Sequence, residues 1–412
     1  MSNLKYWLWL TSRVGVSGQG MAELLSHFGT PESAYFADRH AYESVAGLSE
    51  KPRRSFQDKS LSRVDQILGD CDRLGIRIMT IQDAIYPERL RAIHQPPLVL
   101  YWKGRDIAVD NEAAVAVVGT RSATPYGVRI AEQLGLDLTR AGALVVSGIA
   151  EGIDAAAVRG ALKAGGPVIS VLGGGIDFIY PRFHRDLYAD VAAAGALVSE
   201  YPPGTESRSS HFPVRNRIIS GLSLGVAVVE SPRTGGSLIT AGHALDQDRE
   251  VFAVPGPADA PNSVGTNRLI QEGAAKLILD AEDVVCEFAD RFPDKFGRSA
   301  ALSGEARKQR LENLSAAPDR HRPDPAPPEK EVDNPAKLEY IDWKNYKNKL
   351  TDDQRDILLA LEKGPQVADD LVERTQIPAR RVLAALTILQ VQGFVAEESG
   401  KRFRATVRLR IE

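Results

Sequence analysis

The most regular pattern in the chain is an alternation, from residue 113 to residue 279, of short apolar runs and longer mixed segments. Each apolar run ends in or near a turn, commonly one with glycine, and the segments between runs are long enough for helices. Continuously apolar strands are typical of a parallel sheet that is covered by helices on both faces. We therefore predict a doubly wound, mostly parallel α/β domain with strands at 113–119, 143–148, 167–173, 196–201, 224–231, 250–256 and 276–279.

The first 80 residues have a helical rather than a strand pattern. Val64, Ile67 and Leu74 fall on one face of an expected helix, and glycines interrupt several short helices before it. These features predict a small all-helical domain over residues 1–80. The sequence leaves open whether this domain grips a DNA backbone, contacts another protein or caps the neighbouring domain.

The end of the chain predicts three helices followed by a hairpin. Thr351 and Gln354 have the spacing of a capping box at the start of the first helix. Ser399-Gly400 marks the hairpin turn. This order of elements over residues 346–412 is typical of a winged-helix domain.

A proline-rich stretch separates the winged helix from the rest. Between residues 317 and 337 there are six prolines and one large aliphatic residue, Val332. Such a composition cannot bury enough apolar surface to offset the entropy of ordering, so we predict a flexible linker. The expected order is a helical domain at 1–80, the α/β domain at 81–292, the linker at 293–345 and the winged helix at 346–412.

The composition narrows the classes of function. Of the 412 residues, 43% are hydrophobic and 25% are charged, which excludes a wholly disordered, collagen-like or membrane-embedded protein. The formal net charge of -3 gives no sign of a polyanionic partner, so any nucleic acid must bind to a local patch. Cys71 and Cys286 lack metal-ligand spacing. We expect a cytoplasmic protein without a membrane partner, a disulfide or a metal site.

Unusual residues gather where the predicted strands end. In a parallel sheet, the turns after the strands and the helix N-termini that follow offer backbone N–H groups to a ligand. Arginine adds a forked donor that suits phosphate oxygens. The alternative is a set of ordinary turns with solvated side chains. The candidate residues are Gly119, Thr120, Arg121, Ser122, Ser147, Gly148, Gly174, Gly175, Gly236 and Ser237.

A second cluster, Phe212-Pro213-Val214-Arg215-Asn216-Arg217, enters an apolar helix. An aromatic ring can stack on an unpaired base while arginines meet phosphates, which is the combination expected of a single-strand binder. A phenylalanine before a proline can equally anchor the start of a helix in the core. The residues themselves leave both interpretations of Phe212 open.

Signatures of nucleotide cofactors and of catalysis are missing from the sequence. The turn after the third strand contains G-x-G, but Phe178 stands where a dinucleotide fingerprint needs glycine, and no P-loop motif occurs. The acidic residues near the turns, such as Glu151, Asp154 and Glu230, are better explained as helix caps or dipole partners. We therefore assign no catalytic residue, no cofactor and no metal.

Eight segments, taken in order, closely resemble the DNA-processing protein A family, also called DprA or Smf. They are GTRSATPYG, SGIAEGID, GGGIDFIYP, SEYPPGT, FPVRNRIISGLS, VVESPRTGGSLITA, DREVFAVPG and GTNRLIQEGA. The resemblance covers about residues 80–280. It implies an extended Rossmann-like fold, preceded by a helical domain similar to a sterile alpha motif and followed by a winged helix. It also implies a homodimer that binds single-stranded DNA and helps to load RecA onto DNA coated by single-strand-binding protein during natural transformation.

The resemblance further implies roles for individual residues. Arg121 and Ser122 would contact DNA phosphates, and Gly148 and the glycines near 174 would donate amides. Family members often have a lysine where this chain has Ser209, and Arg208 beside it is the expected substitute. The groove itself would be lined by Phe212, Arg215, Asn216 and Arg217.

Two other functions remain open. Similar Rossmann-like domains include nucleotide phosphoribohydrolases, but their P-G-G-x-G-T-x-x-E motif is replaced here by PRTGGSL at residues 232–238. A regulator of duplex DNA could instead act through the winged helix. The candidate contacts of the winged helix, to DNA or to protein, are Arg380, Arg381, Lys401, Arg402 and Arg404.

Overall fold

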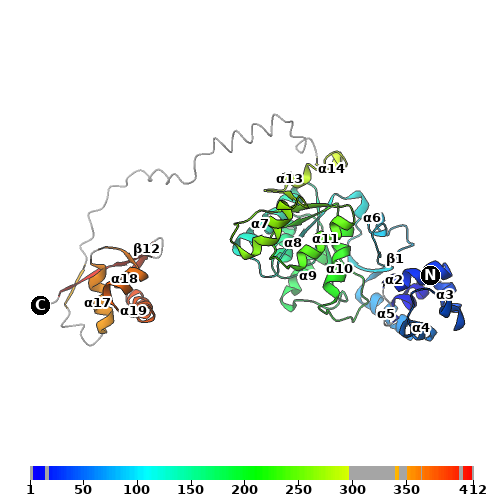
Figure 1. The fold of residues 1–412 in the computed structure, drawn as a ribbon, viewed down its shortest axis with the longest axis horizontal. Coiled ribbons are helices and arrows are strands. Elements are labelled where there is room, and N and C mark those ends of the chain that lie inside the picture. Colours follow the sequence, from blue (N-terminus) through cyan, green and yellow to red (C-terminus); the bar gives the residue numbers. More distant parts are fainter. Residues whose placement is uncertain are drawn as a thin grey trace. The chain divides into compact units, whose positions relative to one another are not determined.

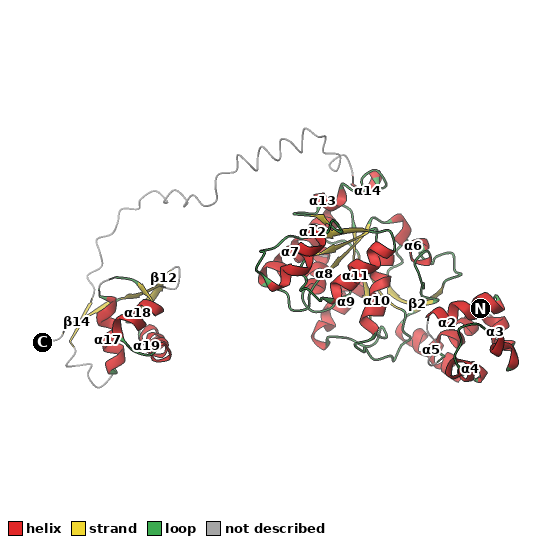
Figure 2. Ribbon diagram, viewed as in Figure 1, coloured by secondary structure: helices red, strands yellow, loops and turns green. Residues whose placement is uncertain are grey.

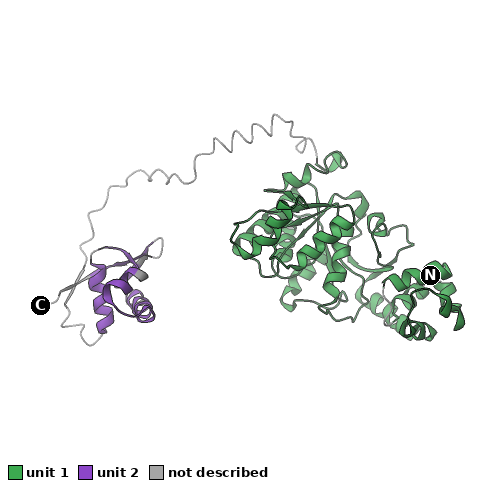
Figure 3. Ribbon diagram, viewed as in Figure 1, with its two compact units in different colours: residues 1–309 green, residues 310–412 purple. Residues whose placement is uncertain are grey.

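The computed structural model describes residues 3–13, 18–296, 339–342, 350–362, 364–398 and 402–410. The chain divides into two compact units, residues 1–309 and residues 310–412 (Figure 3). Helices and a large sheet make up the first unit, and helices with short strands make up the second (Figure 2). Among the described residues, no helix is long and apolar enough to cross a membrane.

The first unit is built on a nine-stranded sheet with the order β1-β2-β6-β5-β4-β3-β7-β8-β9. All neighbouring strands from β6 to β9 in this order pair in parallel. The predicted doubly wound, mostly parallel α/β fold is confirmed. Its parallel strands are β3 (Ala114–Val118), β4 (Leu144–Ser147), β5 (Val168–Leu172), β6 (Ala196–Ser199), β7 (Gly225–Val228), β8 (Glu250–Ala253) and β9 (Lys276–Leu277).

Two antiparallel strands at one edge of the sheet were not expected from the apolar runs. They are β1 (Arg77–Thr80) and β2 (Val99–Gly104), and β2 joins β1 to β6. The sequence pattern assigned residues 77–80 to the helical domain, whereas the structure places them in the sheet. The reason is that β1 is a short edge strand that is only half buried, so it has no continuous apolar run.

Helices cover both faces of the sheet (Figure 1). Side chains of α7 (Pro125–Arg140), α8 (Ile153–Lys163) and α9 (Arg185–Ala194) join one buried cluster. Side chains of α6 (Glu88–Arg91), α10 (His211–Gly221) and α11 (Gly236–Asp246) join the other. Shorter elements are η2 (Val109–Asn111), η3 (Arg182–His184), η4 (Pro261–Ser263), α12 (Val264–Gln271) and α13 (Glu282–Val285).

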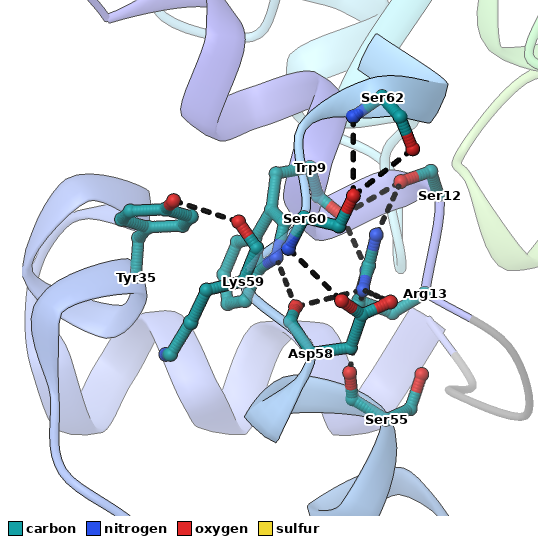
Figure 4. A network of polar contacts seen from close by, with 9 residues as sticks. All are labelled: Trp9, Ser12, Arg13, Tyr35, Ser55, Asp58, Lys59, Ser60 and Ser62. Atoms are coloured by element: carbon teal, nitrogen blue, oxygen red, sulfur yellow. Dashed lines mark hydrogen bonds and ion pairs between the residues drawn. The ribbon is translucent and has the colours of Figure 1, made fainter.

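The segment before β1 is helical and is held by a polar network around Arg13 (Figure 4). Arg13 is 9% exposed, and its Nε donates to the carbonyl of Trp9 at 3.1 Å. Its Nη1 donates to the carbonyl of Asp58 at 2.9 Å, and the Trp9 indole N–H donates to the same oxygen. This network ties the segment before α5 to the end of α1. The elements are α1 (Leu4–Thr11), α2 (Gly18–Phe28), α3 (Pro31–Phe36), η1 (His40–Ser44), α4 (Glu50–Gln57) and α5 (Ser62–Leu74).

The second unit contains the three predicted helices and the predicted hairpin, which confirms a winged helix. The capping box is present, because Thr351 Oγ1 accepts from the Gln354 amide and the Gln354 side chain accepts from the Thr351 amide. The predicted hairpin turn at Ser399-Gly400 lies outside the described residues. The elements are β10 (Glu339–Asp342), α17 (Asp352–Leu361), β11 (Gln366–Val367), α18 (Ala368–Thr375), α19 (Ala379–Val391), β12 (Val395–Glu398), β13 (Arg402–Ala405) and β14 (Val407–Arg410).

The predicted linker at 293–345 overlaps structured residues at both ends. Its first four residues form α14 (Pro293–Phe296), in which Phe296 is buried in the core of the first unit and contacts the ring of Phe292. Near its other end, β10 pairs in parallel with β14. The remaining linker positions, 297–338 and 343–345, lie outside the described residues. Two phenylalanines one helical turn apart, Phe292 and Phe296, indicate a helix here, but the linker was assigned from the proline-rich stretch that follows.

Candidate functional site

A cavity of about 410 Å³, here named the α11 cavity, opens where β3 has β4 on one side and β7 on the other. Such a switch in strand order is where open α/β sheets bind ligands, because the turns after neighbouring strands diverge there. Loops after β3 and β7 and the first turns of α10 and α11 surround the cavity. Its lining is Val118, Gly119, Thr120, Arg121, Ala150, Asp154, Ser209, Phe212, Pro213, Arg215, Asn216, Ile219, Pro232, Thr234, Gly235, Gly236, Ser237, Ile239 and Thr240.

Arg121 and Phe212 meet at this cavity, as the sequence predicted for a single-strand binder. The exposed Arg121 guanidinium lies over the half-buried Phe212 ring, with 4.5 Å between Cζ and the ring centroid. The centroid of the Tyr180 ring lies 5.6 Å from that of the Phe212 ring. Gly173 supports this arrangement, because a β-carbon there would press against the Phe212 ring. Phe212 is therefore neither fully in the core nor fully free.

The loop that carries Arg121 is fixed by residues that the motifs did not single out for this purpose. Glu230, which is 3% exposed, accepts hydrogen bonds from the backbone amide and the hydroxyl of Thr124. Asn262 donates to the carbonyl of Ser122 at 2.8 Å. Gly119 must lack a side chain because a β-carbon would collide with Ile153. The sequence did contain a sign of this arrangement, because a threonine directly before a proline, as in Thr124-Pro125, is typical of a helix N-cap.

Arg215 lines the α11 cavity, as the sequence predicted, but its side chain is buried. The residue is 3% exposed. Its Nη1 donates to the carbonyl of Gly148 at 3.0 Å and to that of Val171. Its charge interacts with Asp154, which is 6% exposed and accepts the Gly148 amide at 3.2 Å. Burial raises the pKa of Asp154 to about 6 against the opposing effect of Arg215. These internal partners give Arg215 a structural role in the wall of the cavity, and its predicted phosphate contact stays a prediction.

Arg217 and Asn216 are also engaged within the fold. Arg217 Nη2 lies 2.7 Å from the Glu200 carboxylate, and its side chain is 12% exposed. Arg217 is not among the residues that line the α11 cavity, and its predicted contact with DNA stays a prediction. Asn216 does line the cavity, where its Nδ2 donates to the carbonyl of Gly236 at 3.2 Å.

Several predicted backbone and hydroxyl donors already have partners inside the protein. Ser147 is fully buried and donates to the Val117 carbonyl at 2.7 Å. Gly148 gives its amide to Asp154, and Gly175 gives its amide to Thr205. Gly174 is buried, and its carbonyl accepts from Ser199. The donors of Ser147, Gly148 and Gly175 are thus used within the fold, whereas the predicted amide contact of Gly174 stays a prediction.

The N-terminus of α11 is the backbone feature that stays open to the cavity. Gly236 is exposed at the first turn, and Ser237 is held beneath it by a 2.9 Å hydrogen bond to the Ser231 hydroxyl. The first amides of a helix have no partner within the helix and favour an anion. Ser209 lines the same cavity, whereas the exposed Arg208 beside it does not.

The basic residues predicted in the winged helix are partly paired. Arg381 donates to both oxygens of Asp353, each at 2.8 Å, and Arg404 lies 2.6 Å from Glu398. Arg380 and Arg402 are exposed, and Lys401 lies outside the described residues. These ion pairs reduce the positive charge that the winged helix can offer to duplex DNA.

Within the described part of the chain, no cluster of three or more histidine, cysteine, aspartate or glutamate side chains could hold a metal ion.

Comparison with known proteins links the two units to one family. Residues 77–289 match the family described as "DNA recombination-mediator protein A", and residues 344–401 match "DprA winged helix domain". Protein Smf of Synechocystis sp. is 31% identical over 98% of this chain and 99% of its own length. DNA processing protein DprA of Bacillus subtilis is 42% identical over 56% of this chain and 77% of its own length. The X-ray structure of DNA processing protein A from Streptococcus pneumoniae matches with a TM-score of 0.61 and 32% identity, over 69% of this chain and 97% of that one.

Proposed function

The chain belongs to the DNA recombination-mediator protein A family (DprA/Smf), and from this premise we propose that it binds single-stranded DNA in the α11 cavity and helps to load RecA onto it. The observation that supports this most directly is the exposed Arg121 guanidinium stacked on the Phe212 ring. An unpaired base can stack on an aromatic ring or on a guanidinium plane, and both accept any base. Recognition would therefore be insensitive to sequence.

The charge of the cavity supports a phosphodiester ligand. The charged residues among its described lining are Arg121, Asp154 and Arg215, and the last two form a buried pair that compensates itself. Arg121 thus leaves an excess positive charge at the mouth, next to the open N-terminus of α11. A phosphate that reaches this point gains a charge-assisted hydrogen bond and favourable helix amides.

The same geometry supports a binding role rather than hydrolysis. Asp154, the carboxylate in the described lining, is engaged with Arg215, and Glu230 behind the β3 loop is engaged with Thr124. Neither carboxylate is left to activate water. We propose that the protein is not an enzyme, and incubation with AMP should release no adenine.

The family also motivates the remaining parts of the proposal. The protein would act as a homodimer in the cytoplasm, on DNA coated by single-strand-binding protein, during natural transformation. RecA-catalysed strand exchange on DNA precoated with that protein tests the mediator role. A stimulated rate in the presence of this chain supports RecA loading, and an unchanged rate contradicts it.

The DNA-binding site is tested by titrating labelled oligo-dT at several salt concentrations. Arg121→Ala should weaken binding by about 1–3 kcal/mol and reduce the salt slope by about 1, because one phosphate contact is lost. Arg140→Ala is the matched control, since Arg140 is exposed in the last turn of α7, which leads to the amino end of β4. Equal binding of oligo-dT by both variants and the wild-type protein would contradict the site.

A further inference from the structure

A second cavity of about 450 Å³, here named the α8 cavity, adjoins the first. Arg121 lines both cavities, so they share one exposed arginine. The floor of the second cavity is formed by the small residues of the first turns of α8 and of the preceding loop. Its lining is Arg121, Ser122, Ala123, Val128, Glu151, Gly152, Ala155, Ala156, Arg159, Phe183 and His184.

Phe183 is the most unusual part of this lining. Its ring is 67% exposed, although burying such a side chain would be favourable by about 2 kcal/mol. Arg159, on the exposed side of α8, lines the same cavity. The α8 cavity therefore repeats the combination of the α11 cavity, an aromatic ring with a guanidinium nearby.

The loop that carries Phe183 also reaches the first site. Tyr180, three residues earlier, contacts the Phe212 ring at 5.6 Å between centroids. The Tyr188 hydroxyl donates to the Tyr180 carbonyl at 3.0 Å, and His184 Nδ1 lies 3.1 Å from the Ile149 carbonyl. These two bonds fix the loop on either side of Phe183. The ring is therefore presented in a set position rather than on a free tip, which lowers the entropy that a ligand must overcome.

We propose that the α8 cavity continues the path of single-stranded DNA beyond the α11 cavity, with a base stacked on Phe183 and the backbone held between Arg121 and Arg159. The inference rests on the proposed function. Glu151 is the carboxylate in the lining, against two guanidinium groups, so the cavity keeps a net positive charge. His184 adds none at neutral pH, because burial lowers its pKa.

The charge distribution also indicates where this path ends. A third hollow lies on the other side of Phe183 and Arg159, and its lining contains Lys163, Asp186 and Asp190. Its two cationic and two anionic side chains balance, and Lys163 is paired with Glu132. A polyanion gains nothing by entering it. Phe183 is thus the far end of the path.

Oligo-dT titrations with chains of about 4 and about 16 nucleotides test the inference. Phe183→Ala and Arg159→Gln should each weaken binding of the longer chain about tenfold and leave the shorter one unchanged, since a lost base stack or phosphate contact has that magnitude. Arg159→Gln should also lower the salt slope by about 1. Phe36→Ala is the matched control, because Phe36 in α3 is 68% exposed but lies in the helical segment before β1.

The outcomes separate this inference from the proposed function. If both variants bind the longer chain as the wild type does while Arg121→Ala loses binding, the path ends at the α11 cavity and the inference fails alone. If they keep DNA affinity but no longer bind RecA in a pull-down, Phe183 is a protein contact and the inference is overturned. If the wild-type chain binds no oligo-dT, the proposed function itself fails. Arg121, Arg159 and Phe183 are exposed, so their variants should melt at the same temperature as the wild-type protein, which shows that they fold.

Discussion

Replacing Arg215 with methionine should lower the free energy of unfolding of the first unit by about 4 kcal/mol, measured in the absence of DNA. The guanidinium is buried beneath the α11 cavity, and methionine keeps much of its volume while removing the charge. Asp154 would then remain as a buried carboxylate without a counter-charge. The carbonyls of Gly148 and Val171 would also lose a donor.

The magnitude follows from opposing effects. Breaking a buried ion pair by removing one partner costs about 3–5 kcal/mol, and each orphaned carbonyl adds about 1–3 kcal/mol if it stays dry. Backbone amides of Gly119, Gly148 and Ala150 still stabilise the Asp154 carboxylate, and the desolvation cost of Arg215 itself disappears. These two effects offset part of the sum, whose lower end is about 5 kcal/mol, so the expected net cost is about 4 kcal/mol. It is a large part of the total of about 5–15 kcal/mol for a typical domain.

The cost should depend on pH with a defined sign. Burial already raises the pKa of Asp154 to about 6, and Arg215 opposes that rise, so its removal must raise the pKa further. Below about pH 6 the Asp154 carboxyl is protonated with or without Arg215, and a neutral carboxyl needs no counter-charge. The destabilisation by Arg215→Met should therefore be largest near pH 8 and should shrink as the pH falls toward 5.

Urea denaturation followed by tryptophan fluorescence measures this effect, because Trp7, Trp9 and Trp102 lie in the first unit. Arg140→Met, at an exposed arginine, is the control and should be nearly silent. Adding Asp154→Asn to Arg215→Met should recover about 1–3 kcal/mol relative to the sum of the single changes. A cost below about 1 kcal/mol at pH 8, or one that does not change with pH, would refute the structural role of Arg215.

Two further predictions concern packing and capping. Gly160→Ala should destabilise the first unit by about 1–3 kcal/mol, because the added carbon collides with the backbone of Glu132 where α7 and α8 meet. Gly242→Ala is the control, since a β-carbon at Gly242 would meet open space. Urea denaturation compares the stabilities of the two variants. Thr351→Ala removes half of the capping box and should cost the second unit about 1 kcal/mol, seen as faster hydrogen exchange in α17, while Thr351→Ser should retain protection.

The alternation of apolar runs was sufficient to predict every parallel strand of the sheet. A strand buried on both faces must be apolar throughout, so its sequence carries the signal locally. The same holds for the capping box at Thr351 and Gln354, whose hydrogen bonds join residues three positions apart. The edge strand β1 escaped prediction because it is only half buried and has no continuous apolar run. The short helix at Phe296 escaped because its local signal, two phenylalanines one turn apart, is weak beside the proline-rich stretch that follows.

The candidate site divides in the same way. Sequence composition identified Arg121 and Phe212, and the fold brings them to one cavity. It could not distinguish Arg121 from Arg215 or Arg217, because an arginine in a sequence has no stated partner. Asp154 lies at the start of α8 and Glu200 just after β6, far from their arginines in the sequence, and only the tertiary structure decides which charges are compensated. A guanidinium next to a carboxylate in the interior supports the fold, whereas one that remains uncompensated at the surface is available to a phosphate.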